Sequence, residues 1–116
     1  MKNTQSLKKS KEFRDVYTNG RSYANKYLVM YILRNELDLN RLGISVSKKV
    51  GNSVTRNLVT RLIRESYRLS EGNFKKGIDI VIIGRINAKE AAFKDIKSAV
   101  EHLGKLQGVF EEIKRK

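Results

Sequence analysis

Basic side chains gather between residues 48 and 68, where Glu65 is the only acidic residue. The basic residues there are Lys48, Lys49, Arg56, Arg61, Arg64 and Arg68. On a helix, positions 57, 61, 64 and 68 share one narrow stripe, made of Asn57 and three arginines with Arg56 beside it. Guanidinium groups are permanently charged and bind phosphate through paired hydrogen bonds. The stripe therefore indicates a phosphate-contacting surface; the alternative is a solvated cationic face whose arginine stems cover the core.

A second set of residues could stack on unpaired bases. Phe13 and Tyr17 are four residues apart and share a helix face, while Tyr31 alternates with aliphatic residues in a strand-like stretch. If the aliphatic side of that strand faces the core, Tyr31 points outward beside Ser45 and Ser47 of a neighbouring strand. Such a platform of rings and hydroxyls suits stacking on bases. Ordinary core packing is the alternative for each ring.

Residues able to catalyse a reaction form no recognisable group. His102, the only histidine, has no acidic partner at metal-binding spacing, and the chain has no cysteine. The glycines from Gly43 to Gly51 do not follow a phosphate-loop pattern. We therefore expect no catalytic residue, no metal site and no cofactor bound by the protein alone.

The net charge of +13 points to a polyanionic partner. Residues 1–70 hold 15 of the 25 Lys and Arg but only 5 of the 12 Asp and Glu, which favours a binding surface over a general aid to solubility. Nucleic acid is the expected partner, and an anionic membrane surface is the alternative. No apolar run approaches the roughly 18 to 20 residues of a membrane span. With no cysteine and no secretory signal, we expect a cytoplasmic protein.

The apolar pattern predicts the elements that must position these residues. Ser10 is placed to cap a helix ending near Thr18, before Asn19-Gly20. Strands are expected at 27–34, 41–49 and 78–84, the last being apolar enough for a strand covered on both faces. A helix is expected at 54–69 after a cap at Asn52 or Ser53, and another from Lys89 towards the C-terminus, through Phe110 and Ile113, weakened by Gly104 and Gly108. On the first of these two helices the inward half is predicted to hold Val54, Leu58, Val59, Leu62, Ile63, Ser66 and Leu69.

This order predicts an α+β fold, in a single domain spanning residues 1–116, with a mixed central sheet of about four strands. A short N-terminal helix, a basic central helix and a C-terminal helix accompany the sheet.

The stretch LGISVSKKVGN, followed by SVTRNLVTRLIRE, resembles the protein subunit of bacterial ribonuclease P. The early Phe-x-x-Val-Tyr helix with its Asn-Gly-Arg exit and the late Asp-Ile-Val-Ile-Ile-Gly-Arg strand extend the resemblance over nearly the whole chain. The resemblance implies an αβββαβα-like fold with a left-handed crossover. It also implies a protein that assists a catalytic RNA, which removes the 5′ leader of precursor tRNA with magnesium ions. The implied partners are that RNA subunit and precursor tRNA, with no DNA and no membrane.

The resemblance also implies where the two RNAs bind. The family's RNA-binding helix maps onto Arg56, Asn57, Arg61 and Arg64, and with neighbouring cations the expected contacts to the catalytic RNA are Lys48, Lys49, Arg56, Asn57, Arg61, Arg64 and Arg68. The family's leader-binding cleft maps onto Phe13, Tyr17 and Tyr31, with Ser45, Ser47 and Lys49 nearby. The sequence departs from the family at Leu58, where arginine is expected, and at Thr60, where lysine is common. We expect Leu58 to pack at the edge of the apolar face.

Other functions remain open from the residues. A ribosomal or general structured-RNA-binding protein would use the same basic helix. A DNA-binding helix-turn-helix regulator is disfavoured, because a strand precedes the basic helix. A self-sufficient nuclease is disfavoured because it would need metal ligands or a general base.

Overall fold

The computed structural model describes residues 1–112 and has an α+β fold, as predicted. In chain order the elements are β1 (Thr4–Ser6), α1 (Ser10–Asn19), β2 (Arg21–Ala24), β3 (Leu28–Arg34), β4 (Asn40–Val46), α2 (Ser53–Ser70), the 3₁₀ helix η1 (Glu71–Asn73), β5 (Ile78–Gly84), the 3₁₀ helix η2 (Ile86–Glu90) and α3 (Phe93–Leu106). After β1, this order is the αβββαβα arrangement that the resemblance implies.

The strands form one mixed sheet in the order β1-β4-β5-β3-β2. β4 is parallel to β1 and to β5, whereas β3 is antiparallel to β5 and to β2. The central position of β5 explains its nearly continuous apolar sequence, because Ile80, Val81 and Ile82 are fully buried. The sheet has five strands, whereas about four were predicted. β1 and β2 are short edge strands, and their sequences lack the apolar alternation by which a strand is predicted.

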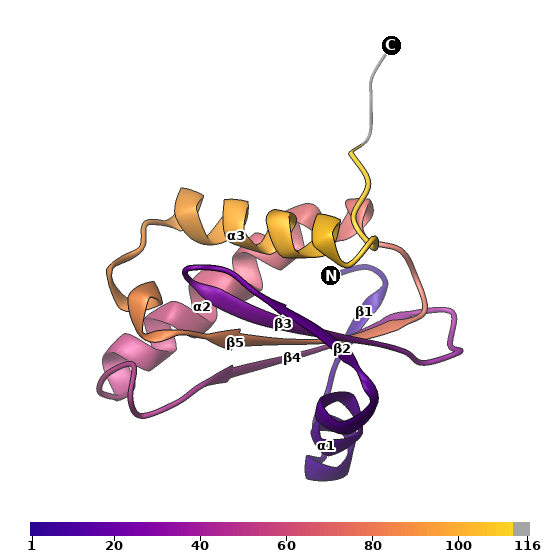
Figure 1. The fold of residues 1–116 in the computed structure, drawn as a ribbon, viewed down its shortest axis with the longest axis horizontal. Helices are drawn as coiled ribbons and strands as arrows, with labels where there is room; N and C mark the ends of the chain where they lie inside the picture. Colours follow the sequence, from indigo (N-terminus) through magenta and orange to yellow (C-terminus); the bar gives the residue numbers. More distant parts are fainter. Residues whose placement is uncertain (113–116) are drawn as a thin grey trace.

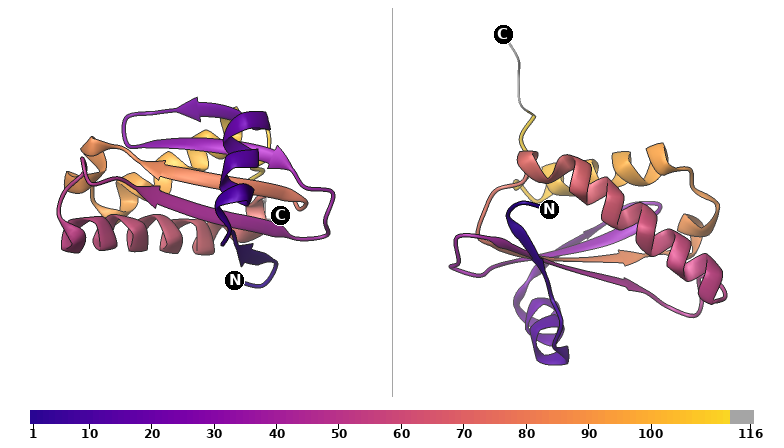
Figure 2. Two further views of the ribbon diagram at one scale, coloured as in Figure 1. Left: turned by 90° about the horizontal axis from the view of Figure 1, so that it is seen from below. Right: turned by 180° about the vertical axis from the view of Figure 1, so that it is seen from behind.

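Helices cover the two faces of the sheet unequally. α2 and α3 pack on one face, and α1 crosses the other (Figures 1 and 2). Leu28, Met30 and Ile32 of β3 face the main core with α2 and α3. The opposite side of β3, which carries Tyr31, packs with Val16 of α1 in a smaller apolar cluster. As expected from the strand alternation, Tyr31 lies away from the main core.

The buried side of α2 differs from the prediction. Asn52 caps the helix by accepting a hydrogen bond from the N–H of Thr55 at 2.9 Å, as expected. The buried residues of α2 are Val59, Ile63, Ser66, Tyr67 and Ser70, and Leu62 is partly buried. The predicted inward positions Val54, Leu58 and Leu69 are wrong, because these side chains are 75%, 49% and 51% exposed.

Tyr67 explains the rotation of α2 relative to the prediction. Its ring is fully buried and contacts Phe74 at a centroid distance of 5.1 Å, so the buried arc centres on Val59, Ile63 and Tyr67. Ser66 fits inside the core because its hydroxyl donates to the carbonyl of Leu62 at 2.6 Å. Ser66 was predicted to face inward, whereas an apolar count around the helical wheel does not place Tyr67 there.

The C-terminal helix is shorter than predicted. α3 ends at Leu106, and Gly108 adopts a positive φ of 73° that turns the chain back. Phe110 therefore does not continue the helix but bridges to Phe74, with the two rings edge-on at 5.3 Å. Ile113 lies outside the described residues. Gly104 stays within α3, where Phe74 and Phe110 pack closely against it.

Candidate nucleic-acid interface

The predicted arginine stripe is present on the outer face of α2. Asn57, Arg61, Arg64 and Arg68 are all exposed. Arg68 pairs with Glu65 on the same helix, with Nε 3.0 Å from Oε2. Within residues 1–112, Arg61 and Arg64 have no ion-pair partner. Two uncompensated guanidinium groups one turn apart are available to bind phosphate.

Arg56 does not flank this stripe. It precedes Val59 by three residues and Ile63 by seven, and therefore shares their side of the helix. The residue is half-buried, and its Nε is buried without a hydrogen-bond partner in the described part of the chain. The prediction that Arg56 lies beside the exposed stripe is wrong. Leu58 precedes Arg61 by three residues and lies beside the stripe, where it is 49% exposed, so its predicted inward position is wrong.

The aromatic residues form a cleft between α1 and the sheet. A cavity of about 420 Å³ is lined by Phe13 and Tyr17 of α1 and by Ser45 of β4. Tyr31 contacts Tyr17 edge-on at a centroid distance of 5.1 Å, and Phe13 lies 6.5 Å from Tyr17. Burial raises the pKa of Tyr17, although a hydrogen bond with Ser45 opposes the change. The phenol is therefore neutral at physiological pH, as a stacking ring requires.

Two cleft residues predicted from the sequence lie elsewhere. Ser47 and Lys49 line a separate cavity of about 280 Å³ with residues 83–87, at the end of the sheet where β4 and β5 finish. Lys48 is exposed in the same turn. Lys8 and Arg14 were not predicted as cleft residues, but they line the aromatic cleft and supply its positive charge. Arg14 precedes Tyr17 by three residues and therefore lies next to it on the helix surface, which was the available signal.

Gly43 allows the ring of Phe13 to lie against β4. A Cβ atom at this position would be 2.4 Å from the Phe13 ring, closer than any side chain can approach. The same ring also lines a neighbouring cavity of about 350 Å³, whose wall includes Arg64 of α2. The two cavities share Phe13 and Ile44. A continuous surface therefore runs from the arginine stripe, over the β1–β4 edge of the sheet, to the aromatic cleft.

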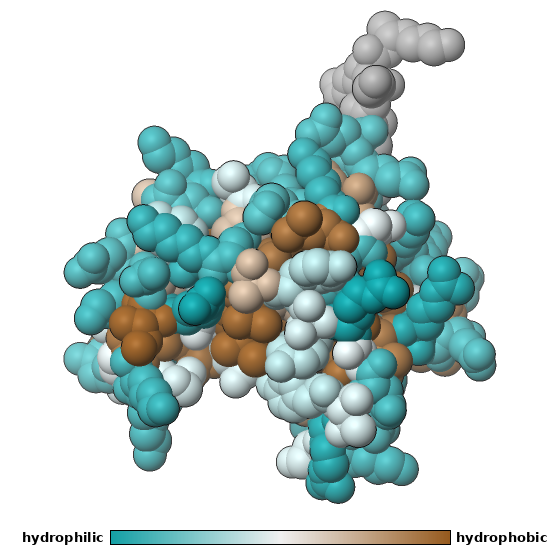
Figure 3. All heavy atoms as spheres, viewed as in Figure 1, coloured by the Kyte–Doolittle hydropathy of each residue, from teal (hydrophilic) through white to brown (hydrophobic). Residues whose placement is uncertain are grey.

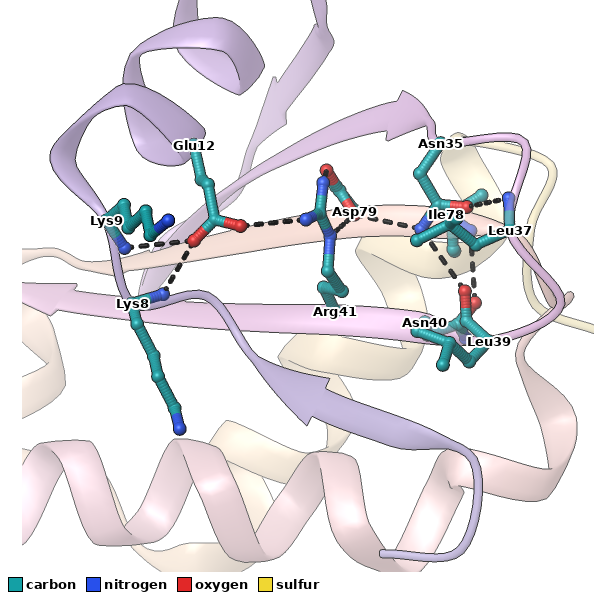
Figure 4. A network of polar contacts seen from close by, with 10 residues as sticks. All are labelled: Lys8, Lys9, Glu12, Asn35, Leu37, Leu39, Asn40, Arg41, Ile78 and Asp79. Carbon is teal, nitrogen blue, oxygen red and sulfur yellow. Dashed lines mark hydrogen bonds and ion pairs between the residues drawn. The ribbon is translucent and has the colours of Figure 1, made fainter.

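A polar network holds α1 in place over the sheet (Figure 4). The Arg41 guanidinium donates to both carboxylate oxygens of Asp79, at 2.8 and 2.7 Å, and to Glu12 of α1 at 2.8 Å. Asp79 is 3% exposed and also accepts a hydrogen bond from Asn35. Arg41 thus joins β4, β5 and α1 through one guanidinium group.

Glu12 also fixes the beginning of α1. Its carboxylate accepts the N–H groups of Lys9 and Lys8, at 2.9 and 3.0 Å, and these bonds, with the charge of Arg41, hold the pKa of Glu12 below its ordinary value. The N-cap is Lys9, so the predicted cap at Ser10 is wrong. The helix ends at Asn19 before Gly20, as expected. The network sets where Phe13 and Tyr17 lie relative to the sheet.

The candidate site offers charged and aromatic groups that can contact nucleic acid. Residues 1–112 contain no group of three or more His, Asp or Glu side chains that could hold a metal ion. His102 is exposed, and its Nδ1 lies 3.2 Å from the amide of Asn25. No helix in that range is long and apolar enough to cross a membrane. The available chemistry is cationic contact with phosphate and stacking of rings on bases.

Comparisons with known proteins match most of the chain to one family. A family model described as Ribonuclease P matches residues 1–107. The Ribonuclease P protein component of Lachnoclostridium phytofermentans is 57% identical over 106 residues, 91% of each chain, and that of Clostridioides difficile is 55% identical over 103 residues, covering 88% of this chain and 90% of that protein. The structure of the Staphylococcus aureus RNase P protein matches with a TM-score of 0.84 at 40% identity, covering 91% of this chain and 97% of that one. The chain therefore belongs to the ribonuclease P protein family.

Proposed function

We propose that this protein is the RNA-binding, non-catalytic subunit of a ribonuclease P ribonucleoprotein and helps its catalytic RNA to remove the 5′ leader of precursor tRNA. The observation that carries the proposal is the continuous surface between the arginine stripe and the aromatic cleft. The stripe, through Asn57, Arg61, Arg64 and Arg68, would bind the catalytic RNA. The cleft, through Phe13, Tyr17, Tyr31 and Ser45, would bind unpaired leader nucleotides beside it. Lys48, Lys49 and Ser47 would extend these contacts from the turn after β4.

The division of chemistry follows from the residues. Phosphate contacts by arginine position an RNA without reading its sequence, and rings stack on bases of any identity. Both properties suit a protein that must accept many different leaders. Bond cleavage would then belong to the RNA and its magnesium ions. Precursor tRNA is made in the bacterial cytoplasm, so the protein would act there.

Reconstitution with a relative's RNA tests this function. The ribonuclease P RNA of Lachnoclostridium phytofermentans is suitable, because the protein of that organism is 57% identical to this one. We expect the protein to bind this RNA and to increase removal of the leader at low magnesium concentration. If about six to ten phosphates are contacted, affinity should fall by ~10³ to 10⁵-fold between 50 and 200 mM salt.

Paired variants separate the interface from the fold. Arg61→Ala/Arg64→Ala should weaken RNA binding and leave the melting temperature unchanged, because both side chains are exposed and unpaired. The matched control Lys89→Ala/Lys94→Ala removes two exposed lysines from η2 and α3 and should bind as wild type. A protein that co-purifies with ribosomal RNA and does not stimulate leader removal would instead be a general RNA-binding protein.

A further inference from the structure

One large cavity is not part of the surface described above. It measures about 960 Å³ and lies where the end of β3, the start of β5 and the segment after α3 meet. It shares no lining residue with the aromatic cleft or with the cavity beside Arg64. It lies on the β3–β2 side of the sheet, opposite the β1–β4 edge. In Figure 1, residues 74–77 run from beside the C-terminal end of α3 to the right-hand end of the sheet, where residues 34–39 lie.

Four cations line this cavity, against one acidic residue, Glu36. They come from three separate parts of the chain and define the basic groove: Arg21, Arg34, Lys75 and Lys76. Across residues 1–112, Arg21, Arg34 and Lys76 have no ion-pair partner, and Lys75 has one loose contact, 3.9 Å from Glu111.

On the neighbouring surface, by contrast, positive side chains are paired with negative ones. On α3, Lys97 pairs with Glu101 at 3.1 Å, and Lys105 pairs with Glu112 at 2.6 Å. Hydrophilic side chains cover much of the face shown in Figure 3, so exposure alone does not distinguish the groove. What distinguishes the groove is the excess of positive over negative side chains that line one cavity. Such a hollow concentrates positive potential and attracts anions.

Hydrogen bonds fix the backbone that carries these cations. They join Gln107 Nε2 to the carbonyl of Arg21 at 2.8 Å, the N–H of Lys75 to the carbonyl of Val109 at 2.9 Å, and the N–H of Asn35 to the carbonyl of Gly77 at 2.9 Å. Phe74, which precedes Lys75 in the chain, is held by its edge-on contact with Phe110. The groove is therefore formed before any ligand arrives, which lowers the entropy cost of binding.

We propose that the basic groove binds a second stretch of phosphodiester backbone of the RNA subunit, at the sheet edge opposite the arginine stripe. The groove is too large for one phosphate, and its two arginines suit paired hydrogen bonds to phosphate oxygens. A polyanion repays clustered cations by releasing counterions. The inference rests on the proposed function. It adds that the RNA contacts the protein at two separated surfaces.

The test uses the full chain and the ribonuclease P RNA of Lachnoclostridium phytofermentans. Lys75→Ala/Lys76→Ala removes two phosphate contacts from the groove and should lower the slope of log affinity against log salt by about 2. Arg21→Ala/Arg34→Ala, on β2 and β3, should do the same, so that a folding defect in one variant leaves the other informative. Lys89→Ala/Lys94→Ala is the matched control and should keep the wild-type slope.

Hydroxyl-radical footprinting places the contact. The wild-type protein should protect two separate regions of the RNA, of which the groove variants lose one and Arg61→Ala/Arg64→Ala loses the other. Folded groove variants that keep the wild-type slope and footprint overturn the inference and leave the arginine stripe intact. Binding of an acidic peptide in the groove with no change in the RNA footprint also overturns it. Failure of the wild-type protein to bind the RNA would instead overturn the proposed function itself.

Discussion

Replacing Arg41 tests the network that holds α1 over the sheet. In Arg41→Ala the carboxylate of Asp79, which is 3% exposed in the wild-type protein, loses both guanidinium hydrogen bonds. Only the amide of Asn35 still donates to it. Glu12 loses its link to the sheet as well.

The cost can be worked from the burial of the pair. Removing one partner of a buried ion pair costs about 3 to 5 kcal/mol, because the remaining charge is buried without compensation. The Arg41 side chain is itself 26% exposed, so water can reach part of the space it leaves, and we expect about 3 kcal/mol. Unfolding entropy of about 2.1 cal/mol/K per residue gives this chain about 0.24 kcal/mol/K. The expected fall in melting temperature is therefore about 12 °C.

Thermal unfolding of three variants measures the effect. Asp79→Asn alone should lower the melting temperature, since it loses the charged pair. The same change in the Arg41→Ala background should raise the melting temperature, because it removes the uncompensated charge and leaves an amide that can still hydrogen-bond with Asn35. A fall of less than about 4 °C in Arg41→Ala, or a further fall on adding Asp79→Asn, would refute the argument that Arg41 compensates the buried Asp79 charge.

Four other measurements test separate parts of the structure. Tyr31→Ala should weaken precursor tRNA binding to the holoenzyme by about 1 to 3 kcal/mol and leave mature tRNA unaffected, while Tyr31→Phe keeps the ring and should bind as wild type; equal weakening for both tRNAs would contradict the cleft. Leu58→Arg should raise RNA affinity and steepen its salt dependence by about 1, without loss of stability, because this position is half exposed beside the stripe. Gly104→Ala should lower stability by about 1 to 3 kcal/mol despite the better helix propensity of alanine, because the new Cβ would lie 2.8 Å from Phe110, and a higher melting temperature would contradict this. The lowered pKa of Glu12 means that its carboxylate stabilises the fold above about pH 4.5 and that this contribution disappears as pH falls through the lowered pKa, so the melting temperatures of wild type and Glu12→Gln should converge on acidification.

The sequence alone was sufficient for features that depend on local spacing. The stripe of Asn57, Arg61, Arg64 and Arg68 follows from helical periodicity once Asn52 caps the helix. The nearly continuous apolar run of β5 identified a strand covered on both faces. The alternation in β3 placed Tyr31 opposite the main core. In each case one element carries all the residues, so its own geometry fixes their relation.

Other features were decided by contacts between distant parts of the chain. Val54, Leu58 and Leu69 are as apolar as the residues that are buried, yet the packing of Tyr67 turned α2 so that these three are exposed while Arg56 is half-buried. Phe110 keeps helical spacing, but the turn at Gly108 and the ring of Phe74 hold it outside α3. Helical periodicity states which residues share a face; the partner elements determine which face is covered.

The aromatic cleft and the basic groove also depend on contacts between distant parts of the chain. The aromatic cleft needs α1 and β4 to meet, and Arg41 brings them together through Glu12 and Asp79, residues 67 positions apart in the chain. The basic groove collects cations from positions 21, 34, 75 and 76, which form no cluster in the sequence. The sequence determined that the chain would be strongly basic and would present an arginine helix. Only the tertiary structure decided which cations share a surface, because long-range strand pairing and ring packing bring together residues that no local pattern connects.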